Sequence, residues 1–319
     1  MPDLSVIIIN WNTRQLLLDC IASIYRTVQQ ATFEIVVVDN GSSDGSVEAV
    51  AKHYAGVIVI ANQRNAGFAK ANNQAIRQMN GRFAVLLNSD TVLTENALDG
   101  MLAFMEARKN AGMCGPRLLN EDGSDQTSVG TFPRLAGEFV SKSLLKVFTP
   151  AVYRACFVPH APEDRNPVVV DFIIGACMMA RKEAIDAAGM LDEDYFFFYE
   201  EIDWCLRMHR AGWPVYHLPQ ASIYHLGGGS SKSVSLKARA ESWRSRYLFF
   251  RKSLKLRRVG AGALFLLGLT QVAYQFTLYT LVNVLTLFSL RRSRRRWGVF
   301  AYLFLWHLRG CPESMCLPR

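Results

Sequence analysis

The sequence predicts an α/β fold in which a mostly parallel sheet carries helices on both faces and is followed by a basic, apolar helical tail. Three observations predict this fold. Apolar strand-like runs alternate with helical patterns over residues 1–115. Basic side chains are concentrated after residue 231, and an uncharged segment of 32 residues lies among them. A chain of 319 residues is long enough for one large domain with an appendage.

Residues 1–117 alternate short β-branched runs with helical patterns. Continuous apolar runs are typical of strands that are buried on both faces. Repeated strand–helix units predict a parallel sheet, and ligands of such sheets bind at the carboxyl ends of the strands. Strands are expected at Ser5–Ile9, Glu34–Val38, Val57–Ile60 and Ala84–Leu87, and helices at Arg14–Gln29, Ser46–His53, Phe68–Met79 and Thr94–Arg108.

Residues 118–231 are expected to complete the body with a less regular pattern. The turn formers Glu121, Asp122 and Gly123 predict a hairpin, and a variable excursion follows up to residue 167. The aromatic run Tyr195–Tyr199 is expected to be buried as a core strand, with stacking on a sugar as the alternative. Further strands are expected at Val168–Ala180 and Trp213–His217, and helices at Lys182–Ala188 and Glu201–Ala211.

The charges divide the chain into a slightly acidic body and a strongly basic tail. Lys and Arg number 36 against 27 for Asp and Glu, a net charge of +9. Residues 1–231 hold 19 basic and 25 acidic side chains, whereas residues 232–319 hold 17 and 2. A nucleic-acid binder would be more uniformly basic, and the arginines between 291 and 296 lack interleaved aromatic side chains. We therefore expect no nucleic-acid partner.

The tail, residues 232–319, is expected to associate with a membrane. Val259–Leu290 carries no charge and is long enough to cross a bilayer. Basic clusters on both sides are attracted to anionic headgroups. If the positive-inside preference holds at both flanks, both ends stay in the cytoplasm, which favours a re-entrant hairpin or an in-plane amphipathic pair over a single span. A buried helical pair in a soluble dimer is the alternative.

Cysteine usage indicates a reducing compartment. The seven cysteines are scattered and none forms a CxxC pair, so neither a disulfide framework nor a zinc site is predicted. We also expect no secretory signal peptide, because the N-terminus opens directly into a strand-like run at Leu4. Together with the tail, these features predict the cytoplasmic face of a membrane.

Polar side chains stand at the ends of three predicted strands. They are Asn10-Trp11-Asn12, the segment Asp39–Gly45, and Asn88-Ser89-Asp90. At equivalent strand ends, these clusters would converge on one cleft. A carboxylate after the second strand suits a nucleoside, and one after the fourth suits Mg²⁺ or Mn²⁺ held against a diphosphate.

Six ordered motifs resemble those of family 2 glycosyltransferases, nearest to the bacterial rhamnosyltransferase-like branch. The resemblance covers about residues 3–231 and not the tail. It implies a GT-A fold and an inverting transfer from a nucleotide-diphosphate sugar, with a nucleotide-sugar half (1–117) and an acceptor half (118–231). The motifs are SVIIINWN at 5–12, VDNGSSDG at 38–45, NAGFAKAN at 65–72, LLNSDT at 86–91, GACMMAR at 175–181 and FFFYEEIDWCLR at 196–207.

The resemblance assigns roles at the donor site. Asp39 would contact the base, and the nucleotide site would also be lined by Asn10, Asn12, Asn65, Gly67 and Asn72. Asn88-Ser89-Asp90 stands in the place of the family's DxD metal motif. Because its first position is Asn, metal binding would depend mainly on Asp90. His225 matches a histidine that completes the metal site in several members, although it could also be purely structural.

The cluster Glu200-Glu201-Ile202-Asp203 is the expected source of the catalytic base, because inverting transfer needs a carboxylate to take the acceptor's proton. The family pattern points to Glu201, and Asp203 and Glu200 remain alternatives. Arg207 could reach the diphosphate or pair with Asp203 at i,i+4. The segment 227–231, GGGSS, could close over the phosphates or serve as a plain linker.

The resemblance implies transfer of rhamnose from dTDP-rhamnose to a lipid-linked saccharide in cell-surface polysaccharide synthesis at the bacterial inner membrane. The tail would then raise the local concentration of a membrane-confined acceptor. A UDP-hexose donor and a non-catalytic membrane scaffold are the alternatives, and oligomer formation is left open. A dehydrogenase is not expected, because no GxGxxG motif occurs.

Overall fold

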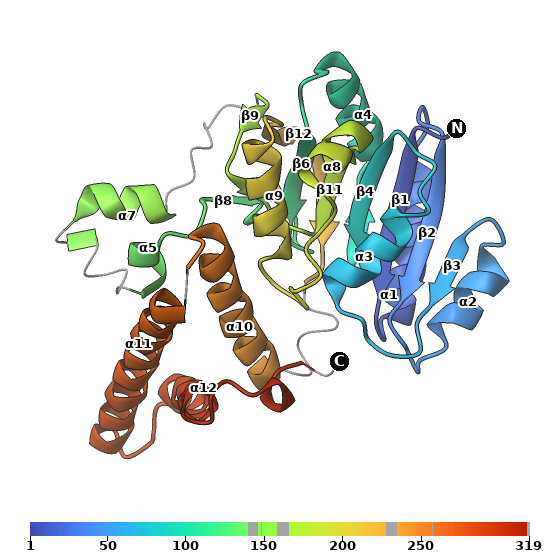
Figure 1. Cartoon of the computed structure of the whole chain (residues 1–319). Coiled ribbons are helices and arrows are strands. Elements are labelled where there is room, and N and C mark those ends of the chain that lie inside the picture. The colour runs from blue at the N-terminus through green and yellow to red at the C-terminus, as the bar shows by residue number, and fades with distance from the viewer. Residues whose placement is uncertain (140–145, 148, 158–165, 228–234, 257, 318–319) are drawn as a thin grey trace.

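The computed structural model describes residues 1–139, 146–147, 149–157, 166–227, 235–256 and 258–317. It is an α/β structure built around a ten-stranded sheet, with three long helices at its C-terminal end (Figure 1). The α/β prediction with a mostly parallel sheet is therefore confirmed. The parts of the predicted excursion at 140–145, 148 and 158–165, and of the segment 227–231 from 228 onward, lie outside the described residues.

The sheet has the order β3-β2-β1-β4-β11-β6-β12-β5, with β7 paired to β6 and β9 paired to β12. Strands β1 to β4 are mutually parallel, whereas β11 is antiparallel to both of its neighbours. The strands are β1 (Leu4–Asn10), β2 (Phe33–Asp39), β3 (Ile58–Ala61), β4 (Phe83–Asn88), β5 (Thr91–Leu93), β6 (Met113–Leu119), β7 (Asp125–Gln126), β8 (Val129–Gly130), β9 (Val168–Val169), β10 (Phe172–Ile173), β11 (Cys177–Arg181) and β12 (Val215–His225).

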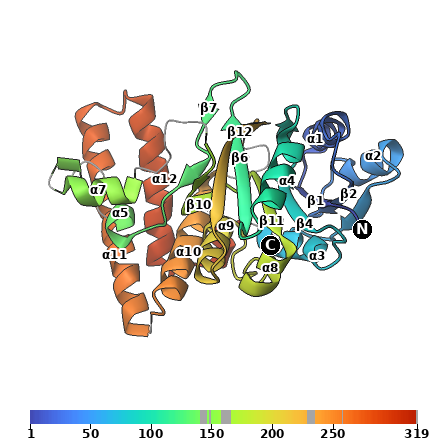
Figure 2. The same cartoon turned by 90° about the horizontal axis from the view of Figure 1, so that it is seen from above.

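Helices cover both faces of the sheet because side chains of the buried strands alternate between two cores. Val6 and Ile8 of β1 join one core with α1 and α4, whereas Ile7 joins the other with α3 and α9. Figure 2 shows α1 and α3 on opposite sides of the strands. The helices are α1 (Arg14–Thr27), α2 (Ser46–His53), α3 (Phe68–Ile76), α4 (Ala97–Ala107), α5 (Leu135–Phe139), α7 (Pro150–Phe157), α8 (Lys182–Ala188), α9 (Glu200–Arg210), α10 (Ser235–Ser253), α11 (Arg258–Leu285) and α12 (Arg291–Leu308).

Three expectations for the second half differ from the structure. The strand expected over 168–180 is divided into β9, β10 and β11, which pair with different partners. The last strand continues past His217 to His225, across a register shift between Leu218 and Ser222 that accommodates Pro219, which lacks an N–H. The aromatic run Tyr195–Tyr199 is a buried turn rather than a strand, because Phe198 and Tyr199 both have φ of +69°.

The C-terminal helices do not form one detached tail. Leu248, Phe249 and Phe250 of α10 belong to the same core as α3 and α9, so α10 is part of the body. Helix α11 adds Leu264 to this core, and α11 and α12 pack against each other, with stacked rings at Phe276–Phe304 and Tyr279–Phe300 (Figure 1). Among the described helices, α11 is long and apolar enough to cross a membrane by length and composition, over Val259–Leu285.

Candidate active site

The ends of β1 and β2 are joined by buried polar contacts. The Asn10 side chain donates to the Asp39 carboxylate at 2.8 Å, and the other Asp39 oxygen accepts the Ser42 N–H at 2.8 Å. The Asn12 N–H donates to the Ser42 hydroxyl, while its side-chain oxygen accepts the Ser43 N–H. Asn10 and Asp39 are almost fully buried. The Asp39 carboxylate thus shapes the turn. Each of its oxygens accepts one of these hydrogen bonds and keeps a lone pair for a further donor.

Asn40, to which the sequence reasoning assigned no role, holds the next loop in place. Its side-chain oxygen accepts hydrogen bonds from Asn62 and from the Ala66 N–H, and its amide donates to the Gly67 carbonyl. Gly67 has φ of +84°, and a Cβ there would lie 2.6 Å from the Phe196 carbonyl oxygen, so only glycine fits. Asn65 accepts the Gly67 N–H at 2.9 Å.

The structure places Asn72 in the core instead of along an open nucleotide site. Its side chain is fully buried, and its amide donates to the Phe68 carbonyl one turn earlier at 2.9 Å. Its side-chain oxygen has no hydrogen-bond partner among the described residues. Asn72 therefore holds the first turn of α3 from a buried position.

Asp90 and His225 meet at the same edge of the sheet, as the sequence predicted. Asp90 directly precedes β5, which pairs with the end of β12 so that Thr91 lies opposite His225. The Leu226 N–H donates to the Asp90 carbonyl at 2.9 Å. His225 Nε2 lies 3.4 Å from Asp90 Oδ1, and both side chains are largely buried. Carboxylate oxygen and neutral imidazole suit Mn²⁺, and Mg²⁺ less well.

Gln126, a residue that the sequence reasoning missed, orients the His225 ring. Its side-chain oxygen lies 2.6 Å from His225 Nδ1, and its amide donates to the His225 carbonyl and to Asn120. Since an amide oxygen only accepts, Nδ1 carries a proton, and Nε2 is the ring nitrogen that faces Asp90. In the described parts of the chain, His, Cys, Asp and Glu side chains form no group of three that could hold a metal. The residues therefore fit a metal whose other ligands come from diphosphate and water.

We expect Gln126→Leu to weaken Mn²⁺ binding about 10- to 100-fold, because the His225 ring loses the partner that fixes its orientation and tautomer. Titration of Mn²⁺ by electron paramagnetic resonance measures this directly. Gln126→Glu keeps the acceptor for Nδ1 but loses the two hydrogen bonds that the amide donates, so retained affinity in this variant would assign the effect to the acceptor alone. Equal Mn²⁺ affinity in Gln126→Leu and the wild type would show that Gln126 does not act through His225.

Glu201 lies beside this edge. Helix α9 begins at Glu200, and the Glu201 side chain packs on the backbone of Gly175, where a Cβ would lie 3.5 Å from Glu201 Cβ and 3.9 Å from Cδ. The neighbouring Ala176 carbonyl accepts the Asn88 N–H at 3.0 Å, two residues before Asp90. The backbone of Gly175 and Ala176 therefore lies between the Glu201 side chain and the end of β4, two residues before Asp90.

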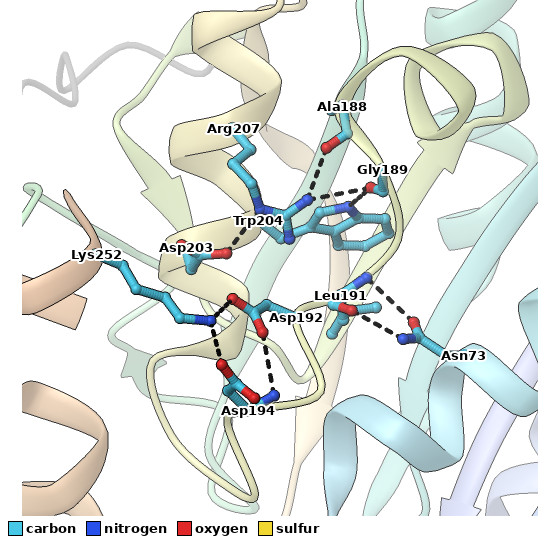
Figure 3. Close-up of polar contacts among 10 residues, drawn as sticks. All are labelled: Asn73, Ala188, Gly189, Leu191, Asp192, Asp194, Asp203, Trp204, Arg207 and Lys252. Carbon is cyan, nitrogen blue, oxygen red and sulfur yellow. Dashed lines mark hydrogen bonds and ion pairs between the residues drawn. The ribbon is translucent and has the colours of Figure 1, made fainter. Parts of the chain in front are cut away.

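Asp203 and Arg207 serve a different region. Successive helical residues are about 100° apart, so Asp203 points away from the face that carries Glu201. Arg207 donates to Asp203 at 2.7 Å and to the Ala188 carbonyl at 2.7 Å, and Trp204 donates to the Gly189 carbonyl (Figure 3). Arg207 lies about 9 Å further along the helix than Glu201, toward the opposite edge of the sheet. Of the two roles that the sequence left open for Arg207, the structure shows the pairing with Asp203.

Residues 5–188, more than half of the chain, match the family described as Glycosyl transferase family 2. The chain belongs to this family. The glycosyltransferase is 26% identical over 230 residues, 67% of this chain and 73% of the relative, to an N-acetylglucosaminyl-diphospho-decaprenol L-rhamnosyltransferase of Mycobacterium tuberculosis. It is 25% identical to the dTDP-rhamnosyl transferase RfbF of Shigella flexneri, over 78% of both chains.

A solved structure shares the fold of this glycosyltransferase. The mannosyltransferase PcManGT of Pyrobaculum calidifontis, in complex with GDP-Man and Mn²⁺, aligns with a TM-score of 0.57 at 16% identity. The alignment covers 98% of this chain and 88% of that one. Together with the family, this likeness confirms the GT-A fold that the sequence motifs implied.

Burial sets the protonation of the carboxylates at the start of α9 in this glycosyltransferase. It raises the pKa of Glu201 above that of an ordinary glutamate. Burial, and the negative charge of Glu201, hold the pKa of Glu200 well above its usual range. Burial also raises the pKa of Asp203, against the opposing effect of Arg207. A raised pKa brings a carboxylate nearer to the operating pH, which improves it as a general base.

The pH dependence of the glycosyltransferase follows from these shifts. A base must be deprotonated, so kcat/KM should rise with pH and reach half its plateau above the ordinary glutamate pKa of about 4.3. The folded state binds these protons more tightly than the unfolded chain, so stability falls as pH rises through the raised pKa values. Rate profiles and urea unfolding across pH 4–9 measure both effects, and a half-maximal rate at an ordinary glutamate pKa contradicts the assignment.

Proposed function

We propose that this glycosyltransferase transfers rhamnose from dTDP-rhamnose to a lipid-linked saccharide, with inversion, in bacterial cell-surface polysaccharide synthesis. The observation that carries the proposal is the approach of Glu201 to the strand end that holds the Asp90–His225 pair. The names of the relatives support the sugar and the acceptor class, since one acts on a diphospho-decaprenol-linked sugar and another is a dTDP-rhamnosyl transferase.

Glu201 acts as the general base. Its carboxylate takes the proton of the acceptor hydroxyl while that oxygen bonds to the anomeric carbon on the face opposite the leaving diphosphate. Glu200 and Asp203 remain outside this step, because Asp203 is committed to Arg207, and burial and the charge of Glu201 raise the pKa of Glu200 well above its usual range. The inversion at the anomeric carbon follows from this single displacement.

Asp90 and His225 would hold the divalent cation, Mn²⁺ or Mg²⁺. When bound, the cation offsets the negative charge that develops on the leaving nucleoside diphosphate. Asn88 stands at the first position of the same motif, and its N–H is used by the Ala176 carbonyl. The turn formed by Asn10, Asn12 and Asp39 would receive the nucleoside, and the loop of Asn65 and Gly67 would close its far side.

The C-terminal helices would bring the site to its acceptor at the cytoplasmic face of the membrane. Helix α11 exposes large apolar side chains along its length, among them Leu266, Leu281 and Leu285, and basic residues of α12 follow it. Apolar surface next to an arginine cluster suits contact with anionic lipid. Confinement of enzyme and acceptor to one surface raises their effective concentration.

Incubation of the full chain with a panel of nucleotide sugars and Mn²⁺, followed by measurement of slow donor hydrolysis, tests the proposal. We expect dTDP-rhamnose to be hydrolysed faster than UDP-hexoses. Faster hydrolysis of a UDP-hexose would identify that class as the donor and overturn the rhamnosyl assignment. If no nucleotide sugar is bound or hydrolysed, the chain is a scaffold and the catalytic proposal fails.

A further inference from the structure

A cavity of about 310 Å³ lies between α10, α11 and α12, outside the site described above. Arg251 and Gly310 among its lining residues are exposed, so the cavity reaches the surface. Its walls combine cationic and aromatic side chains with aliphatic ones, and none of the described residues that line it is acidic. The lining residues are Arg244, Tyr247, Leu248, Arg251, Ala261, Leu264, Phe265, Trp306, Gly310 and Cys311.

The two arginines give the cavity an affinity for anions. Arg251 is exposed and its side chain makes no hydrogen bond or ion pair with any described residue, although its charge helps to lower the pKa of the nearby Asp194. Arg244 donates to Glu241 and Glu313, each at 3.2 Å, which uses two of the five N–H donors of a guanidinium. Glu241 is fully buried and Glu313 is mostly exposed. The exposed, unpaired Arg251 is therefore the principal anion ligand, and Arg244 has donors to add.

One wall of the cavity is apolar. Ala261, Leu264 and Phe265 supply it from the first turns of α11. Further along α11, Leu267, Tyr274 and Leu278 are exposed, but at about 100° per residue they lie roughly a third of a turn around the helix axis from these lining residues. A ligand with an anionic head and an apolar chain would match the cavity, because its head would meet the arginines and the first part of its chain would meet this wall.

Helix α10, which lines the cavity, also contacts the turn that leads into α9. Helix α10, which carries both arginines, carries Glu241, whose negative charge raises the pKa of Glu200. On the same helix, Ser245 donates to the Phe197 carbonyl at 2.8 Å, in the turn that leads into α9. Helix α10 therefore connects the wall of the cavity with the turn that precedes the proposed base.

We propose that this cavity binds the diphosphate and the first isoprenoid units of the lipid that carries the acceptor saccharide. This inference rests on the proposed function. It assigns to Arg251 and Arg244 a binding role that is separate from the donor and metal site. Arginines could bind a diphosphate from either of two sources, a lipid diphosphate or free inorganic pyrophosphate. Titration with both ligands distinguishes them.

The test is isothermal titration of the full chain in detergent with farnesyl diphosphate, farnesol and inorganic pyrophosphate, all in EDTA and without nucleotide. We expect farnesyl diphosphate to bind at least about tenfold more tightly than either of the others, because only it engages both walls. Equal binding of pyrophosphate would identify a free-phosphate site, and equal binding of farnesol a purely apolar one. Either result overturns the proposal.

Two variants probe the two walls. Arg251→Ala should weaken farnesyl diphosphate about tenfold and leave farnesol unchanged, and Ala261→Phe should fill the cavity and weaken both lipids. Arg239→Ala, an exposed arginine of the same helix that does not line the cavity, is the matched control. Unchanged binding of farnesyl diphosphate in both Arg251→Ala and Ala261→Phe overturns the proposal.

Hydrolysis of the nucleotide sugar distinguishes this inference from the proposed function. If the wild type binds farnesyl diphosphate but hydrolyses no nucleotide sugar, the catalytic proposal fails and the cavity assignment stands. If donor hydrolysis is present and the lipid diphosphate does not bind, the cavity assignment alone fails.

Discussion

Glu201→Gln is expected to lower the transfer rate by about 10²- to 10⁴-fold, the range that a positioned general base contributes. The substitution keeps the size of the side chain and its packing on Gly175 but removes the ability to take a proton. Because Glu201 lies outside the nucleotide-binding loops, Mn²⁺ affinity and donor affinity should remain within about twofold of the wild type. Single-turnover transfer to a lipid-linked acceptor, with donor binding measured separately, gives both quantities.

Asp203→Asn is the matched control for this experiment. It changes the other candidate carboxylate of the same helix and breaks the ion pair with Arg207, which also holds the Ala188 carbonyl. We expect lower stability to urea and a transfer rate within about tenfold of the wild type. If Asp203→Asn is folded but inactive and Glu201→Gln is active, Asp203 is the base. The α9 face that carries Asp203, and not the one that carries Glu201, would then meet the acceptor.

Asp90→Asn is expected to abolish metal-dependent donor binding. The loss of a charged ligand should exceed the 10- to 100-fold effect that is typical of an orienting partner such as Gln126. His225→Ala should have a similar but smaller effect, because a water molecule can replace the imidazole. Titration of dTDP-rhamnose with and without Mn²⁺ measures the metal-dependent part.

Glu201→Gln serves as the opposite control in the same titration, since it should bind Mn²⁺ and donor normally and fail only in transfer. Two separable phenotypes are thus expected, one in binding and one in chemistry. Wild-type metal-dependent donor binding in Asp90→Asn would show that the cation is held elsewhere or is not required.

The first half of the fold could be predicted because each of its elements has a local pattern. The buried runs of β1, β2 and β4 are continuous and apolar, and α2 was predicted with the bounds Ser46–His53 that the structure has. The aromatic turn at 195–199 could not be predicted. Two successive non-glycine residues with positive φ are imposed by packing against Gly67 and α10, not by local preference.

The site was predictable to the extent that its motifs lie at strand ends. Asp39, Asp90 and Asn10 fall where parallel strands end, so their convergence follows from the topology. Helical geometry shows that Glu201 and Asp203 lie on different faces, but only the packing of α9 on Gly175 shows which face meets the sheet edge. Gln126 lies on a two-residue strand that gives no periodic signal.

A crystal structure of the full chain with Mn²⁺ and a non-hydrolysable nucleotide sugar tests the central claim, the convergence of base and metal ligands on one site, most directly. We expect anomalous density for Mn²⁺ between Asp90 and His225, with the diphosphate bound to it. The anomeric carbon should face the Glu201 carboxylate across a space that admits one acceptor hydroxyl. Mn²⁺ away from Asp90, or a sugar that faces Asp203, would contradict it.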